Sequence, residues 1–177
     1  MKTFIIEPWI ETYSGLKFDF LNPDVNSIRI KDIAHALSNI CRYTGHTKEF
    51  YSVAQHSVYV ADCVLKEDAL AGLLHDATEA YLTDISKPLK VLLPRYCELE
   101  DFIWTKIAER FGLPEKLPIS VKDADWRLLA TEKRDLLSCS GPAWNTVIGI
   151  ECLPEKIVPW EPKFAEEMFL NRYYSLC

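Results

Sequence analysis

The sequence predicts an all-α protein, a helical bundle of about six helices with a small N-terminal β-hairpin. From residue 32 onward, apolar residues recur three and four positions apart, which is the period of an amphipathic helix. Short connections join these stretches, and strand-like alternation is confined to the first thirty residues. A chain of 177 residues suits one domain. We expect a hairpin extension (1–31), a helical metal-binding core (32–138), and a loop with a C-terminal helix (139–177).

The strand signal lies in the N-terminal extension. The stretch LKFDF (16–20) alternates apolar and polar residues, and SIRI (27–30) alternates again. Between them, LNPDVN supplies the asparagine, proline and aspartate residues that form turns. We expect these two stretches to pair as the hairpin.

Helical periodicity then continues to the C-terminus. Asp32, Asp68 and Ser120 are expected to cap three of the helices, and Gly112 is expected to end a long one. Pro162 suits the first turn of the last helix. The predicted helical stretches are 32–43, 52–65, 68–82, a short helix at 88–93, 95–112, 120–138 and 161–177.

The composition argues against two classes of partner. The net charge of −6 disfavours binding to a nucleic-acid polymer. No apolar run approaches the roughly 18 residues that span a bilayer, and the apolar part of MKTFIIEPWIE is too short for a signal peptide. Six irregularly spaced cysteines without a C-x-x-C pair are typical of reduced core thiols. We expect a cytoplasmic protein that contacts neither a membrane nor a nucleic-acid polymer.

The stretch AGLLHDATEAY (71–81) places adjacent ionisable residues in an apolar helix. His75 and Asp76 each lie about one helical turn from Glu79. Because unpaired charges are costly to bury, a divalent cation held by the imidazole and the carboxylate is expected here. His56 lies in the apolar face of the preceding helix, and a short turn makes the two helices antiparallel. His56 and His75 are therefore expected to face each other.

A further ligand is expected from VKDADWRLL (121–129). This stretch offers Asp123 and Asp125, and periodicity alone leaves both open. Mixed histidine and carboxylate ligands suit a divalent transition metal such as Zn, Mn, Co, Ni or Fe. Such a metal activates water as a nucleophile and neutralises charge on a transferring phosphoryl group. Glu79 is placed to orient that water, and Asp84 to take a proton or pass it to the leaving oxygen.

Cationic and aromatic residues near these acids indicate an anionic substrate. Arg42, Lys87 and Lys90 flank the acidic motif in the sequence. Arginine binds phosphate through two N–H groups, whereas lysine acts as a point charge. Tyr43 is a candidate surface for a base to stack on, and His46 is a further candidate for substrate contact.

Together these residues resemble the HD-domain metal-dependent phosphohydrolases. The shared features are His56 in AQHS, HDATE at 75–79, Asp84, PLK at 88–90 and an aspartate in VKDAD, within a stretch from about 32 to 134. The small 5′-deoxynucleotidases and the phage deoxynucleoside triphosphate hydrolases of that fold are most similar. The resemblance implies metal ligation by His56, His75, Asp76 and Asp125, roles for Glu79 and Asp84 around water and phosphate, and phosphate contact by Arg42.

The resemblance also implies an activity and an assembly. We expect a phosphohydrolase that removes phosphate from deoxynucleoside 5′-monophosphates, since few basic residues surround the motif. One alternative is a deoxynucleoside triphosphate triphosphohydrolase, which often needs additional Mg. A second alternative, which is not an enzyme, is a non-catalytic nucleotide-binding module with a structural metal. Members of the family often form dimers or larger oligomers, so a homo-oligomer is expected. Tyr43 stands where the family has tryptophan, a departure that concerns substrate choice.

Overall fold

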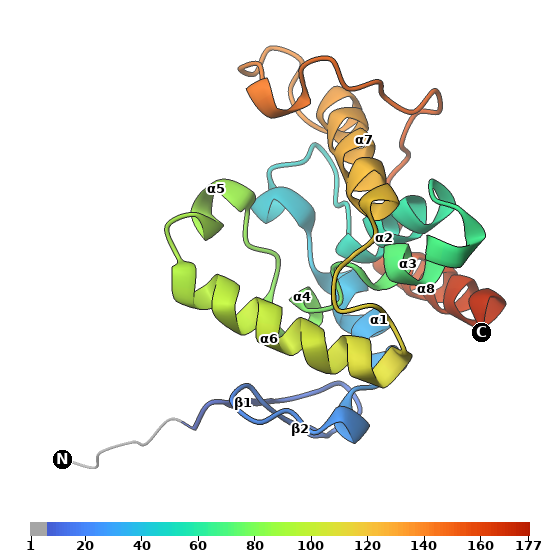
Figure 1. The fold of residues 1–177 in the computed structure, drawn as a ribbon. Coiled ribbons are helices and arrows are strands. Elements are labelled where there is room, and N and C mark those ends of the chain that lie inside the picture. Colours follow the sequence, from blue (N-terminus) through green and yellow to red (C-terminus); the bar gives the residue numbers. More distant parts are fainter. Residues whose placement is uncertain (1–6) are drawn as a thin grey trace.

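The computed structural model describes residues 7–177 and is mostly helical, with one small antiparallel hairpin (Figure 1). The predicted all-α bundle with an N-terminal hairpin is thereby confirmed. The predicted extension starts within residues 1–6, which lie outside the described residues. The elements are β1 (Trp9–Glu11), β2 (Lys17–Asp19), α1 (Ile30–Asn39), α2 (Val53–Asp62), α3 (Ala69–Leu74), α4 (Glu79–Leu82), α5 (Lys87–Lys90), α6 (Pro94–Phe111), α7 (Ile119–Asp135) and α8 (Pro162–Leu176), with short 3-10 turns at η1 (Val25–Ser27), η2 (Arg42–Gly45), η3 (Lys66–Asp68) and η4 (Asn145–Val147).

The hairpin exists, but its predicted pairing was wrong. LKFDF does supply β2, yet its partner is the earlier strand β1, with Ile10 opposite Phe18. Gly15 makes the reversal possible because its φ of +73° is a left-handed conformation that glycine adopts freely. SIRI instead leads from η1 into α1, and its Ile28 is fully buried. The alternation in SIRI therefore reflects entry into the helical core rather than a strand.

Asp32 joins the hairpin to the bundle instead of capping a helix. Helix α1 begins two residues earlier, at Ile30. The buried carboxylate of Asp32 accepts hydrogen bonds from the Thr12 hydroxyl (2.9 Å) and the Ser14 backbone N–H (2.8 Å). The cap prediction was wrong because these longer-range donors bind the carboxylate.

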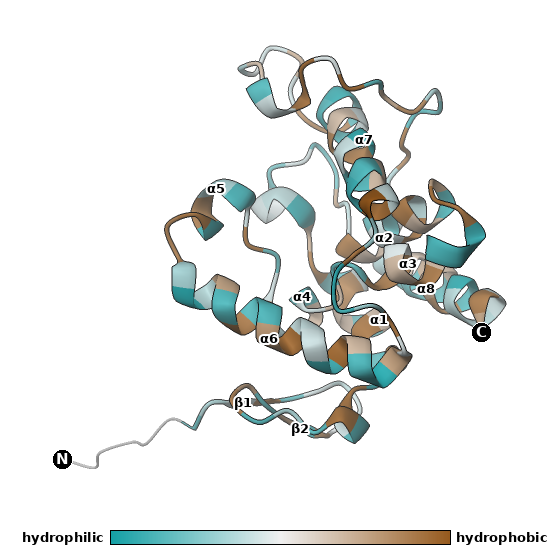
Figure 2. Cartoon of the chain, in the orientation of Figure 1, coloured by the Kyte–Doolittle hydropathy of each residue, from teal (hydrophilic) through white to brown (hydrophobic). Residues whose placement is uncertain are grey.

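The core lies where α1, α2, α3 and α8 pack against one another. The helices carry separate hydrophobic and hydrophilic bands, as amphipathic helices on a shared core do (Figure 2). Phe18 from the hairpin is fully buried and stacks on Tyr81 of α4, with ring centroids 3.9 Å apart. Ala165 and Phe169 of α8 are also fully buried. The C-terminal helix is therefore part of the core that supports the site.

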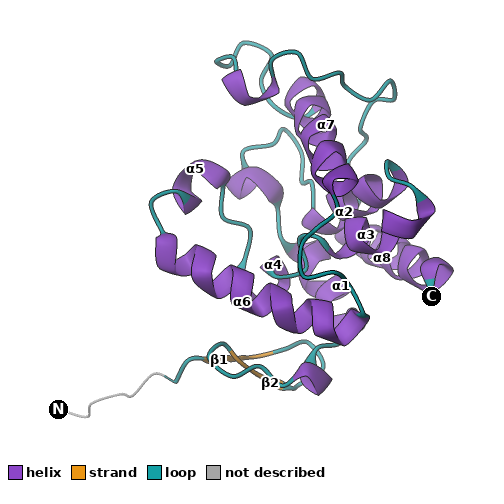
Figure 3. Cartoon of the chain, viewed as in Figure 1, coloured by secondary structure: helices purple, strands orange, loops and turns teal. Residues whose placement is uncertain are grey.

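The predicted helix over 68–82 is interrupted at its centre (Figure 3). Residues 75–78 form tighter turns, in which Ala77 N–H donates to the Leu74 carbonyl (2.9 Å). The His75 Nδ1–H donates to the Gly72 carbonyl at 2.7 Å, and in a continuous helix that carbonyl would accept from the N–H of Asp76. The side chain of His75 thus competes with the backbone N–H of Asp76 for the Gly72 carbonyl, at the point where the predicted metal ligands lie.

The residues expected at the helix ends differ in the role that they take in the structure. Gly112 ends α6 with φ of +65°, as predicted. Helix α7 begins at Ile119, so Ser120 is not its cap, and its hydroxyl donates to Asp68 instead. Asp68 does precede α3, but its side chain makes no capping hydrogen bond.

All six cysteines are free, but each is exposed or half-buried, so the expectation of core thiols was wrong. Within residues 7–177, each helix is too short or too polar to cross a lipid bilayer.

Candidate metal centre and substrate pocket

His56 uses one ring nitrogen for a hydrogen bond within the protein and leaves the other without a partner. It lies in α2 and is fully buried. Its Nδ1 is 2.6 Å from Oε1 of Glu132, which is also fully buried. With Nδ1–H donating to this carboxylate, Nε2 is left as a buried atom without a hydrogen-bond partner. A histidine fixed in this way by a carboxylate is typical of a metal ligand.

His75 is anchored in the same sense by a backbone carbonyl. Its Nδ1–H donates to Gly72, so its Nε2 is free to face the site. The rings of His56 and His75 lie 5.2 Å apart. The short η3 turn makes α2 and α3 neighbours, and the expectation that the two histidines face each other is confirmed.

Two aspartates complete the cluster. Oδ1 of Asp125 lies 3.3 Å from His56 Nε2, and Oδ2 of Asp76 lies 3.2 Å from His75 Nε2 and 3.6 Å from His56 Nε2. Ligands about 2.1 Å from one metal ion would be separated by about 3.0–3.4 Å. The ligand atoms of His56, His75 and Asp125 all lie within 4.8 Å of one another, so this group could hold a metal ion. Asp123, the alternative from the sequence, is exposed.

Glu132 was missed by the sequence analysis, although it organises the site. Its carboxylate accepts hydrogen bonds from Arg42 Nη2 (3.3 Å), Tyr51 (2.9 Å) and Tyr43, besides His56. Burial acts to raise the pKa of Glu132, but Arg42 and His56 outweigh it and lower that pKa to about 2. Glu132 follows Asp125 by seven residues, two helical turns along the same face, and this spacing was the available signal.

Arg42 and Tyr43 reach the site from a strained turn. Arg42 donates to Asp76 (3.3 Å) as well as to Glu132, so it binds both carboxylates at the base of the site. Tyr43 and Thr44 have φ of +56° and +53°, a left-handed conformation that costs about 1–2 kcal/mol per non-glycine residue. The hydrogen bond from the Tyr43 hydroxyl to Glu132 holds this turn in place. Such strain often accompanies a functional site.

Glu79 and Asp84 provide two acids beside the cluster. Burial raises the pKa of Glu79, and the charges of Asp76 and Asp84 raise it further. Oε2 of Glu79 is buried without a hydrogen-bond partner. Burial likewise raises the pKa of Asp84, although Arg42 opposes that effect. Both acids are therefore easier to protonate than an exposed carboxylate.

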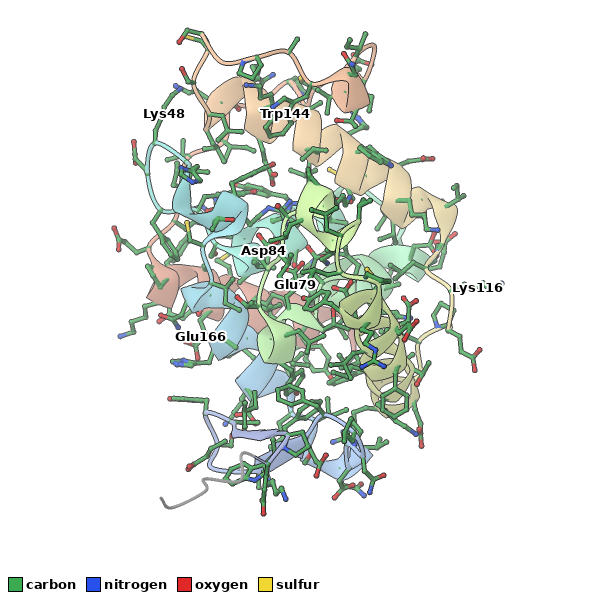
Figure 4. The ribbon with its side chains drawn as sticks, turned by 90° about the vertical axis from the view of Figure 1, so that its left-hand side faces the viewer. Lys48, Glu79, Asp84, Lys116, Trp144 and Glu166 are labelled. Atoms are coloured by element: carbon green, nitrogen blue, oxygen red, sulfur yellow. The ribbon has the colours of Figure 1, made fainter. Side chains whose placement is uncertain are left out.

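A pocket of about 800 Å³ opens above these groups. Figure 4 shows Trp144, Asp84 and Glu79 one above another on this side of the molecule. The metal candidates His56 and His75 do not line the pocket, whereas the other predicted site residues do. Those lining residues are Arg42, Tyr43, His46, Asp76, Glu79, Asp84, Lys87, Lys90 and Asp125.

The lysines of the pocket are paired, and two tryptophans line it with them. Lys87 lies 2.8 Å from Oδ2 of Asp125, and Lys90 lies 2.6 Å from Glu100 and 3.8 Å from Glu79. The sequence analysis did not identify Trp126 and Trp144 as site residues. Trp126 adjoins Asp125 on α7, whereas Trp144 comes from the loop after that helix, where local periodicity gives no signal.

Comparison with known proteins adds relatives but no activity. No family model matches the chain. The chain is 44% identical over 169 residues to the uncharacterized protein YfdR of Escherichia coli (strain K12), and the match covers 95% of each protein. It is 38% identical over 126 residues to the uncharacterized protein RCAP_rcc00048 of Rhodobacter capsulatus, covering 66% of this chain and 64% of that protein.

Proposed function

We propose that this chain, which belongs to the family of Escherichia coli YfdR, is a metal-dependent phosphohydrolase that removes phosphate from deoxynucleoside 5′-monophosphates. One observation carries the proposal. The cluster of His56, His75 and Asp125 adjoins a pocket that Asp125 lines together with further acids and cations. A structural metal site has no need of such a pocket or of surplus acids. The resemblance to HD-domain phosphohydrolases points to the same reaction.

The residues divide between holding the cation and handling the substrate. His56, His75, Asp76 and Asp125 would hold a divalent cation, and their mixed nitrogen and oxygen atoms favour a first-row transition metal such as Zn, Mn, Co, Ni or Fe. When bound, such a cation lowers the pKa of water and neutralises negative charge on a phosphoryl group. Glu132 and Gly72 each bind Nδ1 of one imidazole, which leaves its Nε2 as the atom available to a metal.

The remaining side chains have roles that follow from their protonation and position. The unpartnered oxygen of Glu79 is available to accept a hydrogen bond from the attacking water. Asp84, with its raised pKa, can retain a proton and donate it to the leaving 5′ oxygen. Arg42, which lines the pocket beside Asp76, is positioned to contact the phosphate.

The balance of charge in the pocket favours a monophosphate over a triphosphate. Leaving His46 aside, three cationic side chains (Arg42, Lys87, Lys90) and four carboxylates (Asp76, Glu79, Asp84, Asp125) line it. Both lysines already pair with carboxylates. With Asp84 protonated, as its proposed role requires, the other three carboxylates offset the three cationic side chains, so one divalent cation would leave a positive excess that matches one doubly charged phosphate group. A triphosphate would need additional Mg to balance its charge.

The test is a panel of deoxynucleoside mono-, di- and triphosphates assayed with Mn, Co, Ni, Zn and Mg. We expect inorganic phosphate from the monophosphates, supported best by a transition metal. Release of triphosphate from the triphosphates would instead support the alternative reaction. If no nucleotide is hydrolysed with any metal, the enzymatic proposal is wrong.

Substitution of Asp84 separates an enzyme from a non-catalytic module. Asp84→Asn should keep the bound metal, measured by elemental analysis, and lose at least about 100-fold in turnover. Asp123→Asn, an exposed change on α7, is the control and should alter neither quantity. If Asp84→Asn turns over substrate as fast as the wild type, Asp84 has no catalytic role.

A further inference from the structure

The pocket has one wall that carries no charged side chain. Trp144, Asn145 and Thr146 line it from the segment that follows α7. Lys87 and Lys90 line it from α5, and Asp76 and Asp125 line it as well. The charged groups suit a phosphate, and the uncharged wall suits a different part of the same ligand.

The ring of Trp144 has an aromatic and a cationic neighbour. Its centroid lies 6.0 Å from that of Tyr43, whose hydroxyl is bonded to Glu132. The ammonium of Lys133 lies 5.1 Å from the Trp144 centroid. Lys133 does not line the pocket, so the cation that lies near Trp144 does not come from a pocket-lining residue.

The second tryptophan of the pocket is less available. The ammonium of Lys87 lies 4.7 Å from the centroid of Trp126, and Lys87 does line the pocket. A pocket-lining cation therefore competes with a ligand for the ring of Trp126, whereas the cation near Trp144 does not line the pocket, which makes Trp144 the better surface for an aromatic ligand. Beside it, the Asn145 amide and the Thr146 hydroxyl offer both donors and acceptors, as the edge of a nucleobase requires.

From this arrangement we infer that Trp144 stacks on the nucleobase of the substrate, with Asn145 and Thr146 beside the base edge. The inference rests on the proposed function, because that function places the phosphate beside the metal-binding residues and the nucleobase elsewhere in the pocket. It makes Trp144 a specificity-determining residue: the enzyme distinguishes a nucleotide from the corresponding sugar phosphate. Every base has a flat face, so stacking on Trp144 gives a preference for nucleotides without a strong choice among bases.

The test compares deoxynucleoside 5′-monophosphates with 2-deoxyribose 5-phosphate, which lacks the base. Stacking on an aromatic residue corresponds to about a tenfold or greater change in affinity on removal to alanine. Trp144→Ala should therefore raise KM for the nucleotides about tenfold and leave kcat/KM for the sugar phosphate unchanged. Trp144→Phe should restore most of the loss, and Trp9→Ala, in the hairpin, is the control for tryptophan removal. Equal losses on both substrates, or no loss on nucleotides, would overturn the inference.

A binding measurement keeps this inference separate from the proposed function. Thymidine 5′-monophosphate should quench the tryptophan fluorescence of the wild-type protein, and 2-deoxyribose 5-phosphate should not. In Trp144→Phe, that quenching should be largely lost. If nothing is hydrolysed but this pattern is seen, the proposed function fails and base binding by Trp144 stands. If nucleotides are hydrolysed but quenching is unchanged in the variant, the inference about Trp144 fails alone.

Discussion

Replacing Glu132 by glutamine tests whether this buried carboxylate prepares His56 to bind a metal. The change keeps the shape of the side chain but removes the charge that Nδ1–H of His56 and Nη2 of Arg42 both contact. Loss of a residue that orients a metal-binding histidine typically lowers metal affinity about 10- to 100-fold, which is about 1.4–2.7 kcal/mol. Glu132→Gln should therefore weaken binding of Mn or Zn by that factor.

The same substitution should also lower the stability of the metal-free protein. Removing one partner of a buried ion pair costs about 3–5 kcal/mol. We expect the lower end, about 3 kcal/mol, because Arg42 keeps its contact with Asp76. Denaturant unfolding measures the stability change, and calorimetric titration measures the metal affinity.

Asp123→Asn is the matched control for Glu132→Gln, since it removes a carboxylate from the exposed face of the same helix. It should change stability by no more than about 0.5 kcal/mol and leave metal affinity unchanged. If Glu132→Gln binds metal as tightly as this control, then Glu132 does not orient His56 for ligation and the reasoning is refuted.

Three further predictions concern the cation and the fold. Burial and Arg42 act to lower the pKa of His56, but Glu132 and Asp125 outweigh them and raise it to about 9. Because a metal ion must displace that proton, metal affinity should rise about tenfold per pH unit from pH 6.5 towards pH 9. Calorimetry in buffers of different ionisation enthalpy should detect the released proton. Asp125→Asn should lower metal content in elemental analysis while Asp123→Asn does not, and equal metal content in both would argue against Asp125 as a ligand. Gly112→Ala should lower the unfolding free energy by about 1 kcal/mol in denaturant titration, because the left-handed backbone there suits glycine; an unchanged midpoint would contradict this.

Local sequence determined the helical fold and the first half of the site. The periods of α2 and α3 and the short turn between them brought His56 and His75 face to face. Such a prediction succeeds because a short turn constrains the two helices that it joins to pack antiparallel. The anchoring of His75 on Gly72 is also a contact within one helical turn.

Tertiary packing decided what distant segments contribute. Periodicity could not choose between Asp123 and Asp125, because both lie next to the buried Ala124, and only the packing of α7 against α2 directs Asp125 to His56. It likewise brought Glu132 to His56 and placed Trp144 over the pocket. The hydrophobic pattern of a segment shows which face is buried. Because burial of apolar surface is non-directional, the pattern does not show which other segment that face meets. Which buried groups meet depends on directional hydrogen bonds and ion pairs, formed only after the elements have packed.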